Sequence, residues 1–285
     1  MKYAIVGGDM RSVLLAEALA ADGHRVFCFA NEKGGMSSSV KCRSLPACLF
    51  DADCVVLPIP AEREGFLNAP LSEERMQTGE IISELLPGQR LFGGGISERL
   101  SSLAAAGSIP VFDFMEDEGF VSYNALLTAE AAAGLLIHDC DKAILGSRAL
   151  VLGYGRIGRA LVSRLKALGA DVTAAARSET VLKEAGSAGA HILKLAELES
   201  GIGAFDFILN TVPARILSSS VLCSAAENAA FLELASAPGG FDRKFAENVG
   251  LKIMAAPGLP GRFSPRSSAQ YLKKLICSAV CAGKE

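Results

Sequence analysis

Arg148-Ala-Leu-Val-Leu-Gly153-Tyr-Gly155-Arg-Ile-Gly158 is the stretch that decides the fold of this chain. Its apolar residues before Gly153 have no helical period, as in a buried strand, and its glycines have the spacing of a dinucleotide-binding fingerprint. Apolar residues then recur at helical spacing over 157–168, and residues 171–176 form a second strand-like run. This order predicts a nucleotide-binding βαβ unit, whose helix start suits a pyrophosphate because its first N–H groups are unpaired.

The glycine turn and the end of the second strand supply the predicted cofactor contacts. These are Gly153, Tyr154, Gly155, Arg156, Ile157, Gly158, Ala176, Arg177 and Ser178. A site for NAD places an Asp or Glu at the strand end to accept the ribose hydroxyls, but Arg177 and Ser178 can bind a phosphate there. We therefore predict NADP, with NAD as the alternative. Two other interpretations stay open: Arg177 as a solvated loop residue, and the glycines as a structural turn without nucleotide.

Size and charge narrow the class of protein. The chain has 285 residues, more than one domain usually contains, and half of them are hydrophobic. The net charge is −3 and the charged residues are scattered, which leaves no basic stripe for nucleic acid. No apolar run approaches the ~20 residues of a membrane span, and the N-terminus resembles a strand rather than a signal peptide. We expect a cytoplasmic protein that binds small molecules, with neither nucleic acid nor membrane as partner.

The eight cysteines and three histidines form no metal-site pattern. There is no Cys-x-x-Cys pair, and Cys277 and Cys281 lie four apart on an expected helix without a histidine beside them. We expect no metal, and interpret the cysteines as thiols of a reducing compartment. The few histidines also limit the choice of a catalytic base.

Strand-like and helix-like segments alternate along the chain, which predicts an α/β protein with two Rossmann-like, doubly wound parallel-sheet domains. We expect five strands in the first domain and an irregular polar excursion at 62–78. The predicted parts are a substrate domain at 1–122, an interdomain helix at 123–146, a dinucleotide-binding domain at 147–264 and a terminal helix at 265–285 that packs back on the first domain.

Two turns of the first domain carry candidate substrate contacts. Asp9 and Arg11 follow the first strand, at the side where an open α/β sheet binds its ligands. The alternative for Arg11 is a helix-start residue tied to Asp9. Gly93-Gly-Gly95 follows a later strand, where backbone N–H groups can approach a ligand and Ser97 can add a hydroxyl. The alternative there is a simple bend before a helix capped by Ser97.

In the alanine-rich helix expected at 123–139, the residues from 125 to 137 are small or apolar except for Thr128 and Glu130. A polar group that is buried must find a partner, and a cleft between two domains supplies a substrate or water. We expect both residues to line such a cleft, with solvent exposure as the alternative.

Loops of the second half add further candidates. Asn210, Thr211, Val212 and Pro213 follow a strand that ends where the nicotinamide half of a dinucleotide runs. Two Pro/Gly-rich loops follow the last strands of the sheet: the first places Ala235 beside the cofactor, and the second, at 256–266, places Arg262, Ser264 and Arg266 at the crevice. For the two arginines a surface position is the alternative.

Several motifs together resemble the A subunit of dipicolinate synthase over nearly the whole chain. They are Gly7-Gly-Asp9 with Arg11, the segment 124–130, the glycine fingerprint, Asn210 to Pro213, residues 234–240 and Ala256 to Gly261. The resemblance implies an enzyme of spore-forming bacteria that oxidises a dihydrodipicolinate-level precursor, from a branch of the lysine pathway, to pyridine-2,6-dicarboxylate (dipicolinate). It also implies an architecture similar to formate and glycerate dehydrogenases, a partner in the form of a flavoprotein-like B subunit, and a place in the cytoplasm of the mother cell during sporulation.

Two departures bear on the chemistry. Family members tend to have Thr-x-Glu-Gly where this chain has Ala131 after Glu130, and the histidine of related D-2-hydroxyacid dehydrogenases is absent from residues 257–260. Ring oxidation needs orientation more than a base, because aromatisation favours loss of the proton. For a dicarboxylate substrate we expect Arg11 with Arg262 or Arg266 as cations, Thr128 and Ser264 as hydroxyl donors, and Glu130 as the proton acceptor through water.

Two other functions stay open at this point. Asn210 to Pro213 also suits an NADP-dependent keto- or imino-acid reductase of shikimate-dehydrogenase type. A non-catalytic dinucleotide-binding protein that stabilises its partner is the other alternative. We also expect a homo-oligomer.

Overall fold

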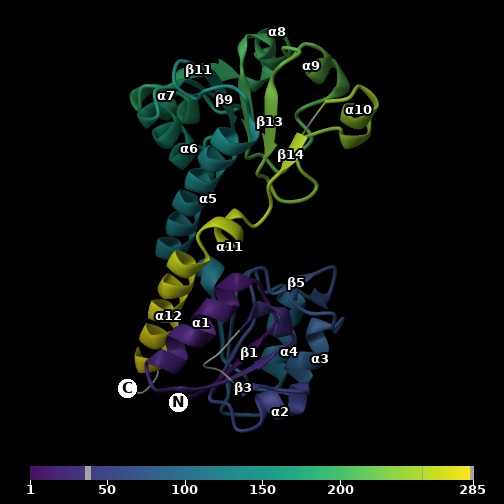
Figure 1. Ribbon diagram of the computed structural model, residues 1–285, viewed down its shortest axis with the longest axis vertical. Coiled ribbons are helices and arrows are strands. Elements are labelled where there is room, and N and C mark those ends of the chain that lie inside the picture. The colour runs from purple at the N-terminus through teal and green to yellow at the C-terminus, as the bar shows by residue number, and fades with distance from the viewer. Residues whose placement is uncertain (36–39, 252, 283–285) are drawn as a thin grey trace. The chain divides into compact units, whose positions relative to one another are not determined.

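The computed structural model describes residues 1–35, 40–251 and 253–282. The chain forms two compact units: unit 1 comprises Met1–Val121 and Gly261–Glu285, and unit 2 comprises Ser122–Pro260. Each unit contains one six-stranded parallel sheet with helices packed on it (Figure 1). The predicted class, an α/β protein with two Rossmann-like sheets, is confirmed.

The sheet of unit 1 has the order β3-β2-β1-β4-β7-β8. The order of the strands therefore reverses between β1 and β4, as in a doubly wound fold. The strands are β1 (Lys2–Val6), β2 (Arg25–Phe29), β3 (Val40–Lys41), β4 (Cys54–Val56), β7 (Arg90–Gly93) and β8 (Val111–Asp113). The five expected strands are present, and the sixth is the two-residue edge strand β3, which is too short to leave a pattern in the sequence. The segment expected to be irregular contains a small antiparallel hairpin, β5 (Glu62–Arg63) and β6 (Phe66–Leu67).

Three helices of unit 1, α1, α2 and α4, begin at residues whose side chains cap them. Asp9 accepts a hydrogen bond from the backbone of Arg11, and Ser97 accepts one from Leu100, which confirms the expected cap. The helices are α1 (Met10–Ala21), α2 (Leu45–Leu49), α3 (Thr78–Ser83), α4 (Glu98–Ala106) and α12 (Pro265–Ala282), with short 3₁₀ turns η1 (Glu32–Gly34) and η2 (Phe114–Glu116). Helix α12 packs along α1 through a core that includes Leu272 and Ile276.

The sheet of unit 2 has the order β11-β10-β9-β12-β13-β14, again with a reversal next to its first strand. The strands are β9 (Arg148–Leu152), β10 (Asp171–Ala176), β11 (His191–Lys194), β12 (Phe207–Asn210), β13 (Ala230–Glu233) and β14 (Ile253–Ala255). The helical elements are α6 (Arg156–Ala167), α7 (Glu179–Ser187), η3 (Leu195–Glu197), α8 (Leu198–Gly201), η4 (Ile202–Ala204), α9 (Ser219–Cys223) and α10 (Arg243–Asn248). The predicted strand, glycine turn, helix and second strand are thus present as β9, α6 and β10.

Helix α11 (Leu259–Phe263) lies within the segment 256–266, which the sequence predicted as a loop. The three prolines and two glycines of this segment, one of each inside the helix, hid the helix, because both residue types are poor helix formers. A proline is tolerated in the first turn, since the N–H that it lacks would have no intrahelical acceptor there.

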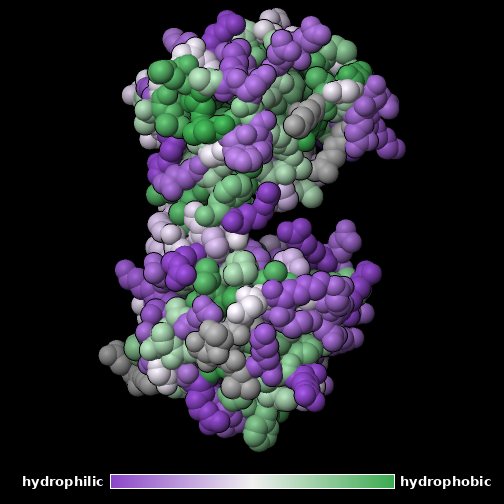
Figure 2. Space-filling model, viewed as in Figure 1, coloured by the Kyte–Doolittle hydropathy of each residue, from purple (hydrophilic) through white to green (hydrophobic). Residues whose placement is uncertain are grey.

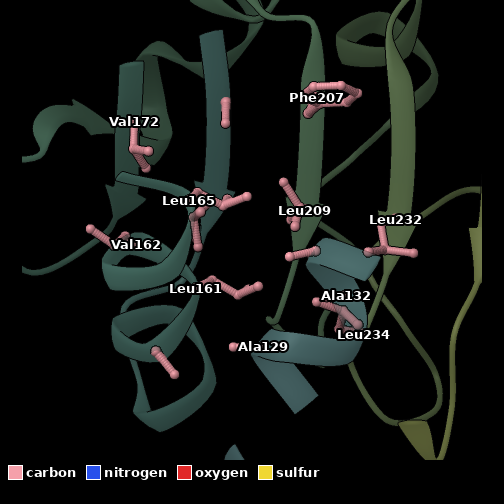
Figure 3. Close-up of a cluster of buried hydrophobic side chains, with 14 of the residues drawn as sticks. Ala129, Ala132, Leu161, Val162, Leu165, Val172, Phe207, Leu209, Leu232 and Leu234 are labelled. Carbon is pink, nitrogen blue, oxygen red and sulfur yellow. The ribbon is translucent and has the colours of Figure 1, made fainter. Parts of the chain in front are cut away.

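Helix α5 (Glu118–Asp139) supplies small residues to the core of unit 2. In Figure 3, Ala129 and Ala132 lie among leucines of α6, β12 and β13, and both alanines are fully buried. By length and composition α5 could cross a membrane, which corrects the expectation that no apolar run is that long. Its burial in the core of unit 2 is typical of a core helix instead.

Hydrophilic and hydrophobic residues are interspersed on the face drawn in Figure 2. Hydrophilic residues cover α10, and a hydrophobic group lies over α6 and α7. The pattern agrees with the scattered positions of the charged residues in the sequence.

Candidate dinucleotide-binding site

Two glycines of the fingerprint are required by packing within unit 2. Gly153 has a φ of +89°, and a Cβ there would lie 2.6 Å from Thr211 Oγ1. A Cβ at Gly158 would lie 2.1 Å from the carbonyl oxygen of Gly153. Any larger residue at either position would therefore push the start of α6 away from β9 or from the loop after β12.

Gly155 differs from the other two, because a Cβ there would meet no atom within 4 Å. It is the N-cap of α6, has a φ of −79° and offers no side-chain cap to the first turn. The first N–H groups of a helix have no intrahelical acceptor, and the helix dipole favours an anion beside them. The open space at Gly155 is thus suited to a phosphate rather than required by the fold.

A groove of about 440 Å³ runs from this turn to the end of β10. It is lined by Gly153, Tyr154, Gly155, Arg159, Ala176, Arg177, Ser178, Val181, Leu195 and Val212. The Arg159 guanidinium lies 4.8 Å from the centroid of the Tyr154 ring, a cation–π contact that holds both side chains at the groove. Seven of the predicted cofactor residues therefore line one continuous groove: Gly153, Tyr154, Gly155, Ala176, Arg177, Ser178 and, from the loop after β12, Val212.

The end of β10 carries cationic and hydroxyl groups. Arg177 and Ser178 are exposed, and no hydrogen bond or ion pair of their side chains is found among the described residues. Ser178 is the N-cap of α7 but its hydroxyl does not cap the helix. The next residue, Glu179, forms an ion pair with Lys194 at 2.6 Å. The hydrogen bond from Lys194 and its charge lower the pKa of the Glu179 carboxyl.

Asn210 and the two residues after it do not all face the groove. Asn210 is fully buried, its Oδ1 accepts from Val212 N at 3.1 Å, and its Nδ2 donates to the Val212 carbonyl at 3.0 Å. Thr211 Oγ1 donates to the Leu152 carbonyl at 2.8 Å. Both polar side chains thus shape the loop, and among Asn210 to Pro213 only Val212 lines the groove.

Glu233 is a buried residue that holds the loops after β12 and β13, and sequence reasoning missed it. Its buried carboxylate accepts from Asn210 Nδ2 at 2.8 Å, from Ala235 N at 3.0 Å and from Gly240 N at 2.6 Å. A Cβ at Gly240 would lie 2.3 Å from Asn210 Nδ2, which explains the glycine. The signal in the sequence was a lone glutamate in the otherwise apolar strand before a Pro/Gly-rich loop.

Thr128 and Glu130 of α5 both have partners within unit 2. Thr128 Oγ1 donates to the Asn124 carbonyl at 2.8 Å, and the exposed Glu130 carboxylate lies 3.2 Å from Arg164 Nη2. The side-chain oxygen of Asn124 is buried without a hydrogen-bond partner among the described residues. The proposed catalytic roles of Thr128 and Glu130 stay predictions.

In unit 1 the structure brings Asp9 and Arg11 together. Arg11 Nη2 donates to Asp9 Oδ2 at 2.8 Å and to the Ile59 carbonyl at 2.6 Å, and Nε donates to Asp9 Oδ1 at 3.0 Å. A Cβ at Gly261 would lie 2.2 Å from Asp9 Oδ2, so the last glycine of the 256–261 motif makes room for this pair. The arrangement matches the helix-start alternative, and a contact of Arg11 with substrate stays a prediction.

The other predicted contacts of unit 1 divide into paired and exposed residues. Gly95 N and Ile96 N donate to the Asp113 carboxylate at 2.9 and 2.7 Å, and Gly94 N donates to the Pro58 carbonyl. These N–H groups thus have acceptors within unit 1, which matches the alternative of a bend before α4. Ser97 Oγ donates to Glu62 Oε1 at 2.8 Å. Arg262 and Arg266 are exposed, and Ser264 directly precedes α12.

The fold and the groove define an NAD-binding protein of the dehydrogenase type. A family model described as the NAD-binding domain of D-isomer specific 2-hydroxyacid dehydrogenases matches residues 137–229, and one described as the N-terminal domain of the dipicolinate synthase A subunit matches residues 2–115. Over 280 residues the chain is 31% identical to the dipicolinate synthase A subunit of Bacillus subtilis (strain 168), and the match covers 97% of this chain and 94% of that protein. The chain belongs to the family of dipicolinate synthase A subunits.

Solved structures agree with this assignment. The crystal structure of the dipicolinate synthase A subunit from Bacillus halodurans has a TM-score of 0.86 at 26% identity and covers 98% of this chain and 97% of that chain. The corresponding crystal structure from Bacillus subtilis has a TM-score of 0.81 at 29% identity, with 100% and 98% covered. A transhydrogenase from Sinorhizobium meliloti, at 17% identity and a TM-score of 0.65 over 96% and 93%, shares the fold alone. The family resemblance inferred from the motifs is confirmed.

Proposed function

We propose that this chain is the oxidising component of a dipicolinate synthase, which converts a dihydrodipicolinate-level substrate to pyridine-2,6-dicarboxylate with NADP as the electron acceptor. One observation supports the proposal above the others. The groove at Gly155 lies in a chain that is similar over its whole length to the A subunit of a dipicolinate synthase.

A bound NADP would supply the acceptor for a hydride from a ring carbon of the substrate. The ring also loses one proton and becomes aromatic, so two electrons and two hydrogens leave the substrate in total. Because aromatisation favours the loss of the proton, the protein contributes mainly orientation and the binding of two carboxylates. The absence of histidine from residues 257–260 fits this chemistry better than alcohol oxidation, which needs a base for the hydroxyl proton.

We assign the substrate roles as follows. Arg262 and Arg266 are exposed cations that can bind carboxylates, and Arg11, Asp9, Ser97, Ser264 and Thr128 are further candidates for contacts. Glu130 is exposed, so water can reach its carboxylate and carry the released proton to it, while Arg164 holds the side chain. These roles rest on residue chemistry, since Arg11 and Ser97 already have partners in unit 1.

The relatives are named for the A component of an enzyme, which implies a second component. We propose that the partner is a flavoprotein-like B subunit, that this chain forms a homo-oligomeric assembly, and that it is active in the cytoplasm of the mother cell of a spore-forming bacterium. Membership in the family of dipicolinate synthase A subunits supports these assignments.

Two alternative functions differ in their support. Asn210 to Pro213 suggests a reductase of shikimate-dehydrogenase type, but the Asn210 amide is used inside the loop and is buried, so it cannot contact a substrate. A non-catalytic dinucleotide-binding role keeps one observation in its favour, because Arg11 and Glu130 both have ion-pair partners in their own units.

The test uses the purified chain with its B partner and freshly generated dihydrodipicolinate-level precursor. NADPH and dipicolinate should form together in equal amounts, faster than dipicolinate forms by spontaneous oxidation. A rate no higher than the spontaneous one would refute the proposal. If this chain with both Thr128→Ala and Glu130→Gln still gave full activity together with the B subunit, the non-catalytic alternative would be favoured.

A further inference from the structure

Lys194 is a cation beside the predicted ribose end of the groove that the sequence reasoning did not consider. It is the last residue of β11 and pairs in register with Ala176, the last residue of β10. The next residue, Leu195, lines the groove together with Ala176, Arg177 and Ser178. Neighbouring strands of a sheet lie ~4.8 Å apart, so the backbone of Lys194 lies one strand away from that of Ala176.

The ammonium of Lys194 is held at this place by an ion pair. Its Nζ lies 2.6 Å from Glu179 Oε1, and Glu179 directly follows Ser178 in the first turn of α7. The side chain of Lys194 is 54% exposed, so the pair stands open to solvent and to a ligand. An ammonium has three N–H donors, and the contact with Glu179 leaves others available.

Residues of opposite charge lie together at this end of the groove. Arg177 and Lys194 are cationic, whereas Glu179 is anionic and Glu197 attracts Lys194 more weakly from η3. A carboxylate at the end of β10 favours a ribose with two free hydroxyls and repels a 2′-phosphate. Glu179 lies three residues past Ala176 and, without Lys194, would supply such a carboxylate.

We propose that Lys194 is a specificity-determining residue for the 2′-phosphate of NADP, and that it acts by neutralising Glu179 and by adding a second cation beside Arg177. The inference rests on the proposed use of NADP. It goes beyond it by naming an ion pair between β11 and α7 as the element that selects between the two dinucleotides.

The experiment measures the Kd of NADPH and of NADH for the full-length chain by titration calorimetry. Lys194→Met should raise the Kd of NADPH about tenfold, the usual scale of one charge-assisted hydrogen bond. The Kd of NADH should rise by no more than twofold or should fall. Lys194→Arg should restore NADPH binding. Glu179→Gln should strengthen NADPH, and the double variant Glu179→Gln with Lys194→Met should bind it less weakly than Lys194→Met alone.

Lys183→Met is the matched control, because Lys183 is an exposed lysine on the same helix as Glu179 and its removal changes the net charge equally. It should leave both Kd values unchanged. The inference would be overturned if the ratio of the two Kd values in Lys194→Met stayed within twofold of that in the unaltered chain. It would also be overturned if the variant lost affinity for NADPH and NADH equally. Failure of the proposed function looks different: the unaltered chain then binds neither dinucleotide or oxidises no substrate.

Discussion

The side-chain amide of Asn210 donates a 2.8 Å hydrogen bond to the carboxylate of Glu233, 23 residues further along the chain. Asn210 ends β12 and Glu233 ends the neighbouring strand β13, where they pair in register. Through its other contacts this pair connects the loop that begins with Thr211 to the loop that contains Ala235 and Gly240. The two loops at this edge of the sheet therefore keep one fixed geometry.

Replacing Glu233 by glutamine tests this connection. Two backbone N–H groups and the Asn210 amide donate to the carboxylate, so a glutamine NH₂ would face a donor. A buried donor left without an acceptor costs about 1–3 kcal/mol, and we expect Glu233→Gln to lower the free energy of unfolding by that amount. Urea unfolding followed by circular dichroism measures the change. The exposed Glu227→Gln is the control, and an equal loss in both variants would contradict the account.

Gly155 and Gly158 of the fingerprint should respond differently to replacement by alanine. Gly155→Ala keeps the fold, because the new Cβ meets open space, so we expect an unchanged melting temperature. The Cβ occupies part of the proposed phosphate site, and we expect the Kd of NADPH to rise about tenfold or more. Gly158→Ala puts a Cβ 2.1 Å from a carbonyl oxygen and should destabilise the chain by at least about 2 kcal/mol. Thermal unfolding and dinucleotide titration of both variants separate the effects. If Gly155→Ala bound NADPH as tightly as the unaltered chain, the phosphate would not bind at Gly155.

The pair Asp9 and Arg11 predicts a stability effect in unit 1. Arg11→Met leaves the partly buried Asp9 carboxylate without its cation, and removing one member of a buried pair typically costs about 3–5 kcal/mol. Because Asp9 is 27% exposed, we expect a smaller loss of about 2 kcal/mol. A KM for substrate that is unchanged in the remaining folded protein would mean that Arg11 only supports α1. A raised KM would mean that it also contacts the substrate.

Asp206 predicts a dependence of stability on pH. The hydrogen bond from Lys142, followed by that from Arg148 N at 2.7 Å, lowers the pKa of this carboxyl. A group with a lowered folded pKa stabilises the fold above its unfolded pKa, about 3.9 for Asp, and loses that contribution as the pH falls through the folded value. Lys142→Met should therefore reduce stability at neutral pH and leave the difference from the unaltered chain near zero at the acid end. Urea unfolding at a series of pH values measures it, and a constant difference would contradict the assignment.

Features that depend on residues close in the sequence were predictable. The apolar runs, the glycine spacing and the cap at Ser97 identified β9, α6, β10 and α4, because their hydrogen bonds and turn conformations lie within a few residues. Strand β3, with two residues, and helix α11, with five residues that include a proline and a glycine, were missed because such short segments carry no periodicity. The family followed from motifs that are themselves short.

What the sequence by itself determined is the class of protein, the position of the glycine turn and the residue types at the end of β10. Only the tertiary structure decided which polar groups are used internally. The Arg11 guanidinium reaches the carbonyl of Ile59, 48 residues away, Glu130 meets Arg164 across 34 residues, and Glu233 meets Asn210 across 23. Hydrogen bonds and ion pairs form between groups that are close in space, and the folding of a sheet brings together side chains that no spacing along the chain relates.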